Sequence, residues 1–239
     1  QGKLEGLSLT CLDFEAGDSA DRVEVTTDTS AYAKITVSAW VNLESVGNWR
    51  GIIQCSDDAG WNDGFGLTLN GSSELGFWID GASDQANLSA SDTAALVGKW
   101  VHIVGTYDGT DQKLYIDGLL KDTEADTWSN KAASGSKIKI GCGVIAGNGN
   151  GYWHDGKIRD AQIWKDIALT AEQVASMYSG SYNVTPYLGY KLDAGTGNQS
   201  GWGTANAGGA ADGVVNGATW VNGTLDLDST LTIAANGTL

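Results

Sequence analysis

Residues 156–178 read GKIRDAQIWKDIALTAEQVASMY, and this stretch decides the fold. Ile158, Ala161 and Ile163 give a roughly alternating apolar pattern, which predicts a β-strand. Thr170 is a suitable helix N-cap, and Gln173 in the next turn completes a capping box. The stretch therefore predicts a strand that runs directly into a short helix over residues 170–178, and no helical pattern is found elsewhere.

The rest of the chain is rich in short strand patterns separated by turn residues. Asn-Asp-Gly, Asn-Gly-Ser-Ser and Asp-Gly-Thr-Asp segments separate these patterns, and such residues favour hairpin turns. Many short strands at regular spacing with little helix predict an all-β fold, an antiparallel β-sandwich. The expected strands are residues 35–43, 51–55, 65–69, 75–79, 101–107, 114–116, 137–141 and 157–164.

Five segments, in the order expected for the family, resemble laminin-G-like domains of the concanavalin A-like jelly-roll type. Residues 156–175 resemble the closing signature G-x-I-D-[DE]-V-R-I-W-x-x-A-L-[ST], although Arg159 replaces its first acid. The resemblance covers roughly residues 8–178 and implies a concanavalin A-like jelly roll, a scaffold used for sugar binding, cell adhesion and glycan hydrolysis. The other matching segments are residues 12–25, 35–41, 100–109 and 113–118.

The C-terminal part of the chain has a different organisation. Residues 188–197 and 212–220 resemble the leader that normally opens such a domain, so a front-end pattern stands at the back of the chain. We therefore divide the chain into a jelly-roll domain at residues 1–180 and a β-rich extension at residues 181–239. An isolated strand pair is marginally stable. The extension is therefore expected to pack on the same sandwich or on a neighbouring one, where it could mediate assembly.

Composition excludes some classes of protein. The formal net charge is −15, which argues against nucleic-acid binding because a duplex requires a basic surface. Runs of about 18 apolar residues are absent from the sequence, so no membrane span is expected. The three cysteines, Cys11, Cys55 and Cys142, fit no zinc spacing and are expected to be buried; a Cys11–Cys142 disulfide stays possible on sequence alone.

Catalytic residues of related β-glucanases are not reproduced. Those enzymes use two acids in the pattern E-x-D-x-x-E. The nearest match here is Glu124-Ala-Asp-Thr-Trp-Ser129, in which serine replaces the last acid and which is expected to lie in a loop. His102 is expected to be a packed strand histidine, and His154 lies in a loop without a nucleophile motif. We therefore predict that the protein is not an enzyme.

Calcium is the metal that the resemblance implies. In laminin-G-like and pentraxin-like domains Ca²⁺ often lies where the opening loop meets the signature strand. By position, Asp18 and Asp21 match the acids of the opening loop and Asp160 matches the second acid of the signature. Carboxylate oxygens are suitable Ca²⁺ ligands, so these three residues form the candidate metal site.

Aromatic residues in polar loops suggest a ligand-binding surface. A flat aromatic ring beside amide and carboxylate groups suits a sugar, because the ring packs on the pyranose and the polar groups bond its hydroxyls. These side chains could equally cap the ends of the sandwich or fill an interface. The candidate ligand-binding residues are Trp49, Trp61, Asn62, Asp63, Tyr152 and Trp153.

The sequence thus favours a non-catalytic surface module, extracellular or on a virion, that binds a glycan or a surface protein. The first alternative is a structural virion surface or capsid decoration protein, suggested by the resemblance of the Asn-Gly-Thr repeats and the tail to phage surface proteins. The second alternative is a glycoside hydrolase of the β-glucanase type.

Overall fold

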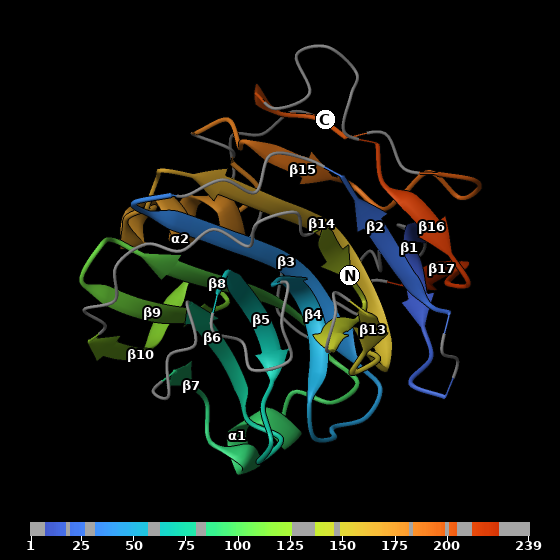
Figure 1. The fold of residues 1–239 in the computed structure, drawn as a ribbon, viewed down its shortest axis with the longest axis horizontal. Coiled ribbons are helices and arrows are strands. Elements are labelled where there is room, and N and C mark those ends of the chain that lie inside the picture. Colours follow the sequence, from blue (N-terminus) through green and yellow to red (C-terminus); the bar gives the residue numbers. More distant parts are fainter. Residues whose placement is uncertain are drawn as a thin grey trace, which may run out of the picture.

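The computed structural model describes residues 8–17, 20–26, 32–56, 63–79, 85–125, 137–145, 149–181, 184–198, 201–204 and 212–224. These residues form two antiparallel β-sheets packed face to face (Figure 1), which is the predicted sandwich. Sheet A has the strand order β10-β9-β8-β3-β14-β1-β17, and β15 also pairs with β14. Sheet B has the order β16-β2-β11-β4-β5-β6-β7, and β12 and β13 form a separate hairpin.

The strands of sheet A come from both ends and the middle of the chain. They are β1 (Ser8–Phe14), β3 (Ile35–Leu43), β8 (Trp100–Tyr107), β9 (Asp111–Ile116), β10 (Leu119–Ala125), β14 (Gly156–Lys165), β15 (Leu188–Tyr190) and β17 (Thr219–Thr224). The strands of sheet B are β2 (Arg22–Val25), β4 (Arg50–Cys55), β5 (Phe65–Leu69), β6 (Leu75–Ile79), β7 (Ala86–Asn87), β11 (Ile138–Ile140) and β16 (Val214–Asn216). The hairpin consists of β12 (Gly143–Ile145) and β13 (Gly149–Gly151).

The core lies between the sheets and follows the alternation of the strands. On β3, the residues Ile35, Val37, Ala39, Val41 and Leu43 all lie in the main hydrophobic core, as predicted. The opposite face of this strand is also largely covered, because Thr36 and Ser38 are buried.

Helix α2 (Ala171–Tyr178) covers part of the outer face of sheet A. Thr170 caps it, and both hydrogen bonds of the predicted capping box with Gln173 are present. The helix contributes Val174 and Met177 to a second apolar cluster with Trp164, Val104 and Tyr115 of sheet A. The expectation of a single helix was wrong, because α1 (Ala90–Ala94) begins at the N-cap Ser89. Neither described helix is long and apolar enough to cross a membrane.

Strands of the C-terminal extension complete both sheets within the same chain. Figure 1 shows the blue strands β1 and β2 beside the red and orange strands β17 and β16. β17 pairs with β1, β16 pairs with β2, and β15 pairs with β14. Strand pairing therefore crosses the predicted boundary at residue 180. Residues 225–239, which hold the end of the tail, lie outside the described residues.

Cys11, Cys55 and Cys142 are buried, and none of them forms a disulfide within the part of the chain that the structure describes. Cys11 lies on β1 and Cys55 on β4, whereas Cys142 lies between β11 and β12. The structure therefore contains no Cys11–Cys142 disulfide, and burial raises the pKa of the Cys142 thiol to about 12. A thiol in this environment is protonated and unreactive at neutral pH.

Candidate functional site

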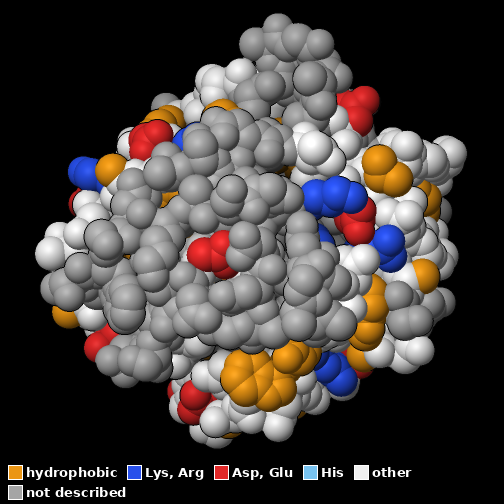
Figure 2. Space-filling model, in the orientation of Figure 1, with side chains coloured by type: hydrophobic (Ala, Val, Ile, Leu, Met, Phe, Trp, Pro, Cys, Tyr) orange, Lys and Arg blue, Asp and Glu red, His pale blue; other side chains and the backbone are white. Residues whose placement is uncertain are grey.

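Two aromatic side chains from distant loops meet at one end of sheet B. The ring centroids of Trp49 and Tyr152 lie 6.1 Å apart, with an interplanar angle of 41°. Trp49 is 44% exposed, and Tyr152 is half-buried. Figure 2 shows hydrophobic side chains gathered at the lower edge of the molecule, over the ends of β4 and β5.

Both aromatic residues have a left-handed backbone, with φ of 60° at Trp49 and 53° at Tyr152. Bulky side chains rarely adopt this conformation, which costs about 1–3 kcal/mol at each such residue. Ser73, in the neighbouring turn between β5 and β6, also has a positive φ of 61°. Such strained residues cluster at functional sites more often than elsewhere.

Main-chain hydrogen bonds fix the positions of the two rings. Trp49 N donates to Asn70 O at 3.1 Å, which ties the β3–β4 loop to the β5–β6 turn. Gly51 N donates to Tyr152 O at 2.7 Å, which ties β4 to the segment before β14. Gly71 carries no side chain because a Cβ there would lie 2.5 Å from the Trp49 ring. The indole therefore lies directly on the turn.

Amide and hydroxyl groups are carried by Asn48, which precedes Trp49, and by the turn to which Trp49 N is bonded. The Ser73 hydroxyl donates to the side-chain oxygen of Asn48 at 2.7 Å, and both residues are near or at the surface. In the same turn, the side-chain nitrogen of Asn70 donates to a Glu74 carboxylate oxygen at 3.0 Å. These groups can exchange hydrogen bonds with a bound hydroxyl compound, while the rings supply an apolar face.

A polar network connects the aromatic pair to the opening loop. Asp155 accepts a short hydrogen bond from the Ser45 hydroxyl, forms an ion pair with Arg50 at 3.2 Å and accepts a bond from Ala16 N at 3.3 Å. Burial alone would raise the pKa of Asp155, but these partners lower it. The carboxylate is therefore ionised at neutral pH and holds three chain segments together.

Three further carboxylates lie at the same end of the sandwich. One oxygen from each of Asp13, Glu15 and Glu44 lies within 4.8 Å of the others. Lys157 Nζ lies 3.5 Å from an Asp13 oxygen and forms a short bond with Glu44. Burial raises the pKa of Asp13, and desolvation together with the charges of Asp13 and Glu44 raises that of Glu15. Oxygen ligands of this kind suit Ca²⁺, although Lys157 already supplies one positive charge.

The outer face of sheet B carries a continuous row of side chains. Glu24 on β2, Lys139 on β11, Gln54 on β4, Gly66 on β5 and Trp78 on β6 are successive cross-strand partners. Lys139, Gln54 and Trp78 are all buried, and burial lowers the pKa of Lys139. Gly66 makes room for the indole, since a Cβ there would lie 2.4 Å from Trp78 Nε1.

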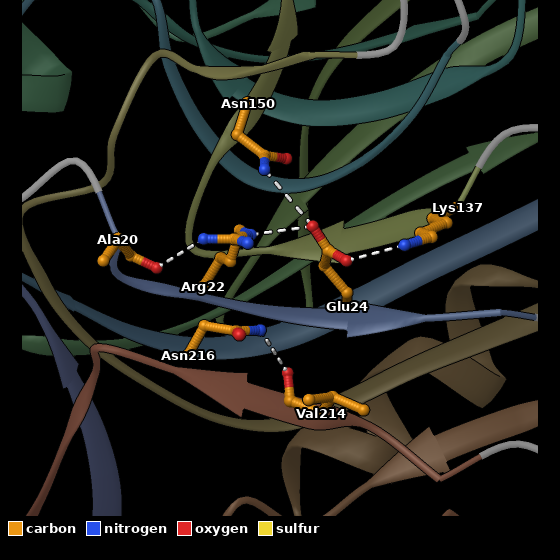
Figure 3. Close-up of polar contacts among 7 residues, drawn as sticks. All are labelled: Ala20, Arg22, Glu24, Lys137, Asn150, Val214 and Asn216. Atoms are coloured by element: carbon orange, nitrogen blue, oxygen red, sulfur yellow. Dashed lines mark hydrogen bonds and ion pairs between the residues drawn. The ribbon is translucent and has the colours of Figure 1, made fainter.

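Glu24, at one end of this row, is the centre of a charged network (Figure 3). Its carboxylate accepts hydrogen bonds from Arg22 at 2.7 Å, Lys137 at 2.8 Å and the Asn150 side chain at 3.2 Å. Burial would raise the pKa of Glu24, but the bonds from Lys137 and Arg22 lower it to about 2. Asn150 belongs to β13, so the network holds the β12–β13 hairpin against sheet B.

The structure brings only some of the predicted ligand-binding residues together. Trp49 and Tyr152 are in contact, and Trp153 follows Tyr152 and is half-buried. Asp63 is buried and accepts a hydrogen bond from the Ser56 hydroxyl at 2.7 Å, so this oxygen is turned toward the protein. Trp61 and Asn62 lie outside the described residues.

Asn48 and the turn residues Asn70, Ser73 and Glu74 were not predicted as part of a site. The sequence identified residues 70–73 as a hairpin turn, and Asn48 directly precedes Trp49. Their approach to one another depends on the pairing of β4 with β5, which places Arg50 opposite Leu69. The adjacent Asn48 and Trp49 were the only local sequence signal.

The predicted calcium ligands do not form one cluster among the described residues. Asp21 is buried and one of its carboxylate oxygens accepts a hydrogen bond from Glu15 N at 2.9 Å, which places it near the end of β1. Asp160 lies four residues beyond Gly156 on β14, about 13 Å further along the strand at the usual rise per residue. Asp160 forms ion pairs with Arg159 at 2.8 Å and Lys191 at 3.2 Å. Asp18 lies outside the described residues.

The hydrolase-like motif lies at the edge of sheet A. Glu124 is half-buried on the edge strand β10, so the expectation of a loop was wrong for Thr123–Ala125, which continue the hairpin with β9. Residues 126–129 lie outside the described residues. His102 is a packed strand histidine, as predicted, with its Nε2 3.1 Å from the Ser38 hydroxyl.

Comparison with known proteins agrees with this architecture. A sequence profile of the concanavalin A-like lectin/glucanases superfamily matches residues 17–175. The chain belongs to this superfamily. The resemblance that the sequence motifs suggest is therefore confirmed over most of the chain. A search of curated protein sequences finds no match.

Solved structures with this superfamily's fold include one bacterial protein and one animal protein. A proposed carbohydrate-binding protein from Bacteroides ovatus has a TM-score of 0.66 and 16% sequence identity, covering 90% of this chain. The chain spans 60% of the length of that protein. A heptameric SAP-like pentraxin from Limulus polyphemus has a TM-score of 0.55 and 17% identity, covering 74% of this chain and 85% of the pentraxin. At these identities the similarity establishes the fold of this superfamily member.

Proposed function

We propose that the protein is a non-catalytic carbohydrate-binding module whose ligand packs on Trp49 and Tyr152. The single observation that supports this proposal best is the adjacency of the two rings on strained backbones, 6.1 Å apart and with positive φ at both residues. Glycine or asparagine would adopt these conformations at lower cost. The backbone therefore does not favour an aromatic residue at either position. Contact of the two rings with a ligand would explain why aromatic residues stand there.

The surroundings of the rings match the chemistry of a sugar. A pyranose presents an apolar face of C–H groups and a rim of hydroxyls, so it requires a flat apolar surface and groups that both donate and accept hydrogen bonds. Asn48 and Ser73 offer such groups beside Trp49. The Bacteroides ovatus protein with the same fold is described as a proposed carbohydrate-binding protein, which agrees with this proposal. The proposal itself rests on the two aromatic rings.

A small ligand fits this surface better than a protein partner. A stable protein interface buries about 800 Å² on each partner, whereas this site is centred on one exposed indole and one half-buried phenol. The proposal excludes catalysis because Ser129 stands where a retaining glycosidase needs its second acid. Assembly through the tail and a location on a cell or virion surface stay predictions.

Glycan binding can be tested with a glycan array followed by calorimetry on the best ligand. Trp49→Ala and Tyr152→Ala should each weaken binding by about tenfold or more, the equivalent of about 1.4 kcal/mol. Tyr178→Ala is the matched control, because Tyr178 is 42% exposed on α2 at the other sheet. Equal binding by all three variants, or loss of binding only with Tyr178→Ala, would place the site elsewhere.

Catalysis is tested on the same ligands. Release of reducing ends from an array-positive β-glucan, abolished by Glu124→Gln, would show that the module is a hydrolase. Strong retention of a protein ligand without any glycan signal would favour the adhesion alternative. A protein that binds a glycan and leaves it intact after prolonged incubation is the expected result.

A further inference from the structure

His154 is a buried imidazole without a polar partner. Its side chain is fully buried, and neither ring nitrogen has a hydrogen-bond partner in the part of the chain that the structure describes. The ring meets Phe14 edge-on, with centroids 6.3 Å apart. A buried polar group left without partners costs about 1–3 kcal/mol. The proposed binding of a sugar does not require this residue.

The charges that face His154 come from two elements. Arg50 on β4 disfavours the imidazolium, and Asp155 in the histidine's own segment favours it. Phe14 on β1 meets the ring edge-on, and Gly141 accepts the main-chain hydrogen bond of His154. Neither residue carries a charge. Burial, followed by the charge of Arg50, lowers the pKa of His154 to about 3. The folded protein therefore keeps this imidazole neutral well below the usual pKa of 6.5.

Three main-chain hydrogen bonds hold the segment 152–155 to the sandwich. Gly51 N donates to Tyr152 O at 2.7 Å, His154 N donates to Gly141 O at 2.9 Å, and Glu44 N donates to Asp155 O at 3.0 Å. The first bond is adjacent to Arg50, which faces the imidazole, and it fixes the residue that carries the Tyr152 ring. If this segment opened, Tyr152 would move away from Trp49.

We propose that residues 152–155 form an acid-sensitive latch in which protonation of His154 opens the segment and separates Tyr152 from Trp49. As a means of regulating ligand binding, the latch rests on the function proposed above; as a conformational device, it stands on the three hydrogen bonds alone. Protonation drives the opening because an imidazolium buried beside Arg50 is strongly unfavourable, whereas water accepts it freely in the open segment.

The size of the effect follows from linkage. An opened segment returns His154 to a pKa of 6.5, so its opening constant rises as the pH falls below that value. Between about pH 7.5 and about pH 4.5, one proton taken up only by the open form raises the opening constant by about 100-fold. Asp155 adds little in this range, because its pKa is below its usual value in the closed form.

Hydrogen exchange at the amides of Gly51, Glu44 and His154 tests the latch directly. After correction for intrinsic exchange, their opening constants should rise by about 100-fold over this pH range in the wild-type protein. In His154→Gln they should become independent of pH. The chain has only two histidines, so His102→Gln is the matched control and should retain the full pH dependence.

A second measurement does not depend on the variant folding. The ring of His154 in the wild-type protein should show no titration in the closed form by NMR above about pH 4.5, while the three amides lose protection together. Protection that is unchanged between the two pH values, or equal pH dependence in His154→Gln and wild type, would overturn the latch.

Ligand binding separates the latch from the function on which its regulation rests. Once a glycan ligand is identified, its affinity should decrease as the pH is lowered in wild type and in His102→Gln. The affinity should stay constant over pH in His154→Gln. Loss of amide protection at low pH in a protein that binds no glycan would contradict the proposed function and support the latch. Glycan binding by a protein whose amide protection is constant over pH would support the proposed function and contradict the latch.

Discussion

The rings of Trp49 and Tyr152 meet with centroids 6.1 Å apart, and both residues have a left-handed backbone. The two residues belong to different connections, one leading into β4 and the other into β14. The hydrogen bond from Gly51 N to Tyr152 O joins these connections. The sandwich thus holds two unfavourable local conformations next to each other, and this arrangement leads to the first prediction.

At position 49, glycine should be tolerated better than alanine. A positive φ penalises every residue with a Cβ, whereas glycine adopts it freely. We expect Trp49→Gly to be more stable than Trp49→Ala by about 1 kcal/mol, although glycine normally destabilises relative to alanine. Both variants should lose ligand binding equally. Urea denaturation measures the difference, and a more stable Trp49→Ala would show that the backbone there is not strained.

Replacing Glu24 should loosen the outer face of sheet B. Glu24→Gln removes the charge that pairs with Arg22 and Lys137 while nearly keeping the shape of the side chain. We expect a loss of about 1–3 kcal/mol in the free energy of unfolding, because two partly buried cations lose their partner. Glu124→Gln on the edge strand β10 is the control and should change stability by less than about 0.5 kcal/mol.

The two buried histidines should make the fold sensitive to mild acid. Burial lowers the pKa of His102 to about 4, and burial with Arg50 lowers that of His154 to about 3, both from 6.5. The unfolded chain therefore binds protons below pH 6.5 that the folded chain does not bind. Stability is complete above that pH and falls as the pH decreases, by about 1.4 kcal/mol per pH unit for each histidine.

Urea unfolding at a series of pH values measures this slope. Glu24, with a folded pKa of about 2 against an ordinary 4.5, contributes to acid sensitivity only at lower pH. Asp13 and Glu15, whose pKa values are raised in the folded protein, take up protons in the folded state and oppose the slope of the histidines. The histidine contribution is therefore the difference in slope, between pH 6.5 and about 4.5, between wild type and the double variant His102→Gln with His154→Gln. An equal slope in the two proteins would contradict the burial of the two imidazoles.

The strand pattern of the sandwich was largely predictable because each strand alternates between core and surface. β3, β5 and β6 begin and end where the sequence predicted, since Ile35–Leu43, Phe65–Leu69 and Leu75–Ile79 are bounded by turn residues. β10 was missed because Leu119–Ala125 has mostly exposed and polar side chains and is held by its pairing with β9. Local sequence does not show that pairing.

The candidate site was predictable only in part. Trp49 and Tyr152 were identified as aromatic residues in polar loops, but their contact depends on the register of β4 and on the Gly51–Tyr152 hydrogen bond. The acids Asp13, Glu15 and Glu44 were missed as a group. Asp13 lies on β1, Glu15 directly follows β1, and Glu44 directly follows β3. Only the order of the strands in the sheet brings these three acids together.

Calcium addition separates the carboxylate group at the end of β1 from the ligands expected by resemblance. If Ca²⁺ binds at Asp13, Glu15 and Glu44, millimolar Ca²⁺ should raise the melting temperature, and Glu44→Gln should abolish this increase. Asp160→Asn should leave it intact, because Asp160 pairs with Arg159 and Lys191. Loss of the calcium effect with Asp160→Asn alone would favour the site expected from the sequence. A melting temperature that neither Ca²⁺ nor a chelator changes would argue against both.

Removal of the C-terminal extension should unfold the sandwich. β15 brings the buried side chains Leu188 and Tyr190 onto β14, and Leu192 follows them into the core. Each buried side chain of this size stabilises the fold by about 1.5–3 kcal/mol. The three together approach the whole stability of a typical domain, about 5–15 kcal/mol. The truncated chain would also expose the edge of β1 that pairs with β17, and exposed edges promote aggregation.

The matched comparison is a chain ending at Thr224, which keeps β17 and removes only residues 225–239. We expect this chain to keep the wild-type melting temperature and the chain ending at Gly180 to aggregate or to unfold at ambient temperature. Light scattering coupled to size exclusion reports the oligomeric state of both. A chain ending at Gly180 that is folded and monomeric, from an oligomeric parent, would mean that the extension joins subunits. The strand pairs β15–β14, β16–β2 and β17–β1 would then form between chains in solution, with the same register but a neighbouring molecule as the partner.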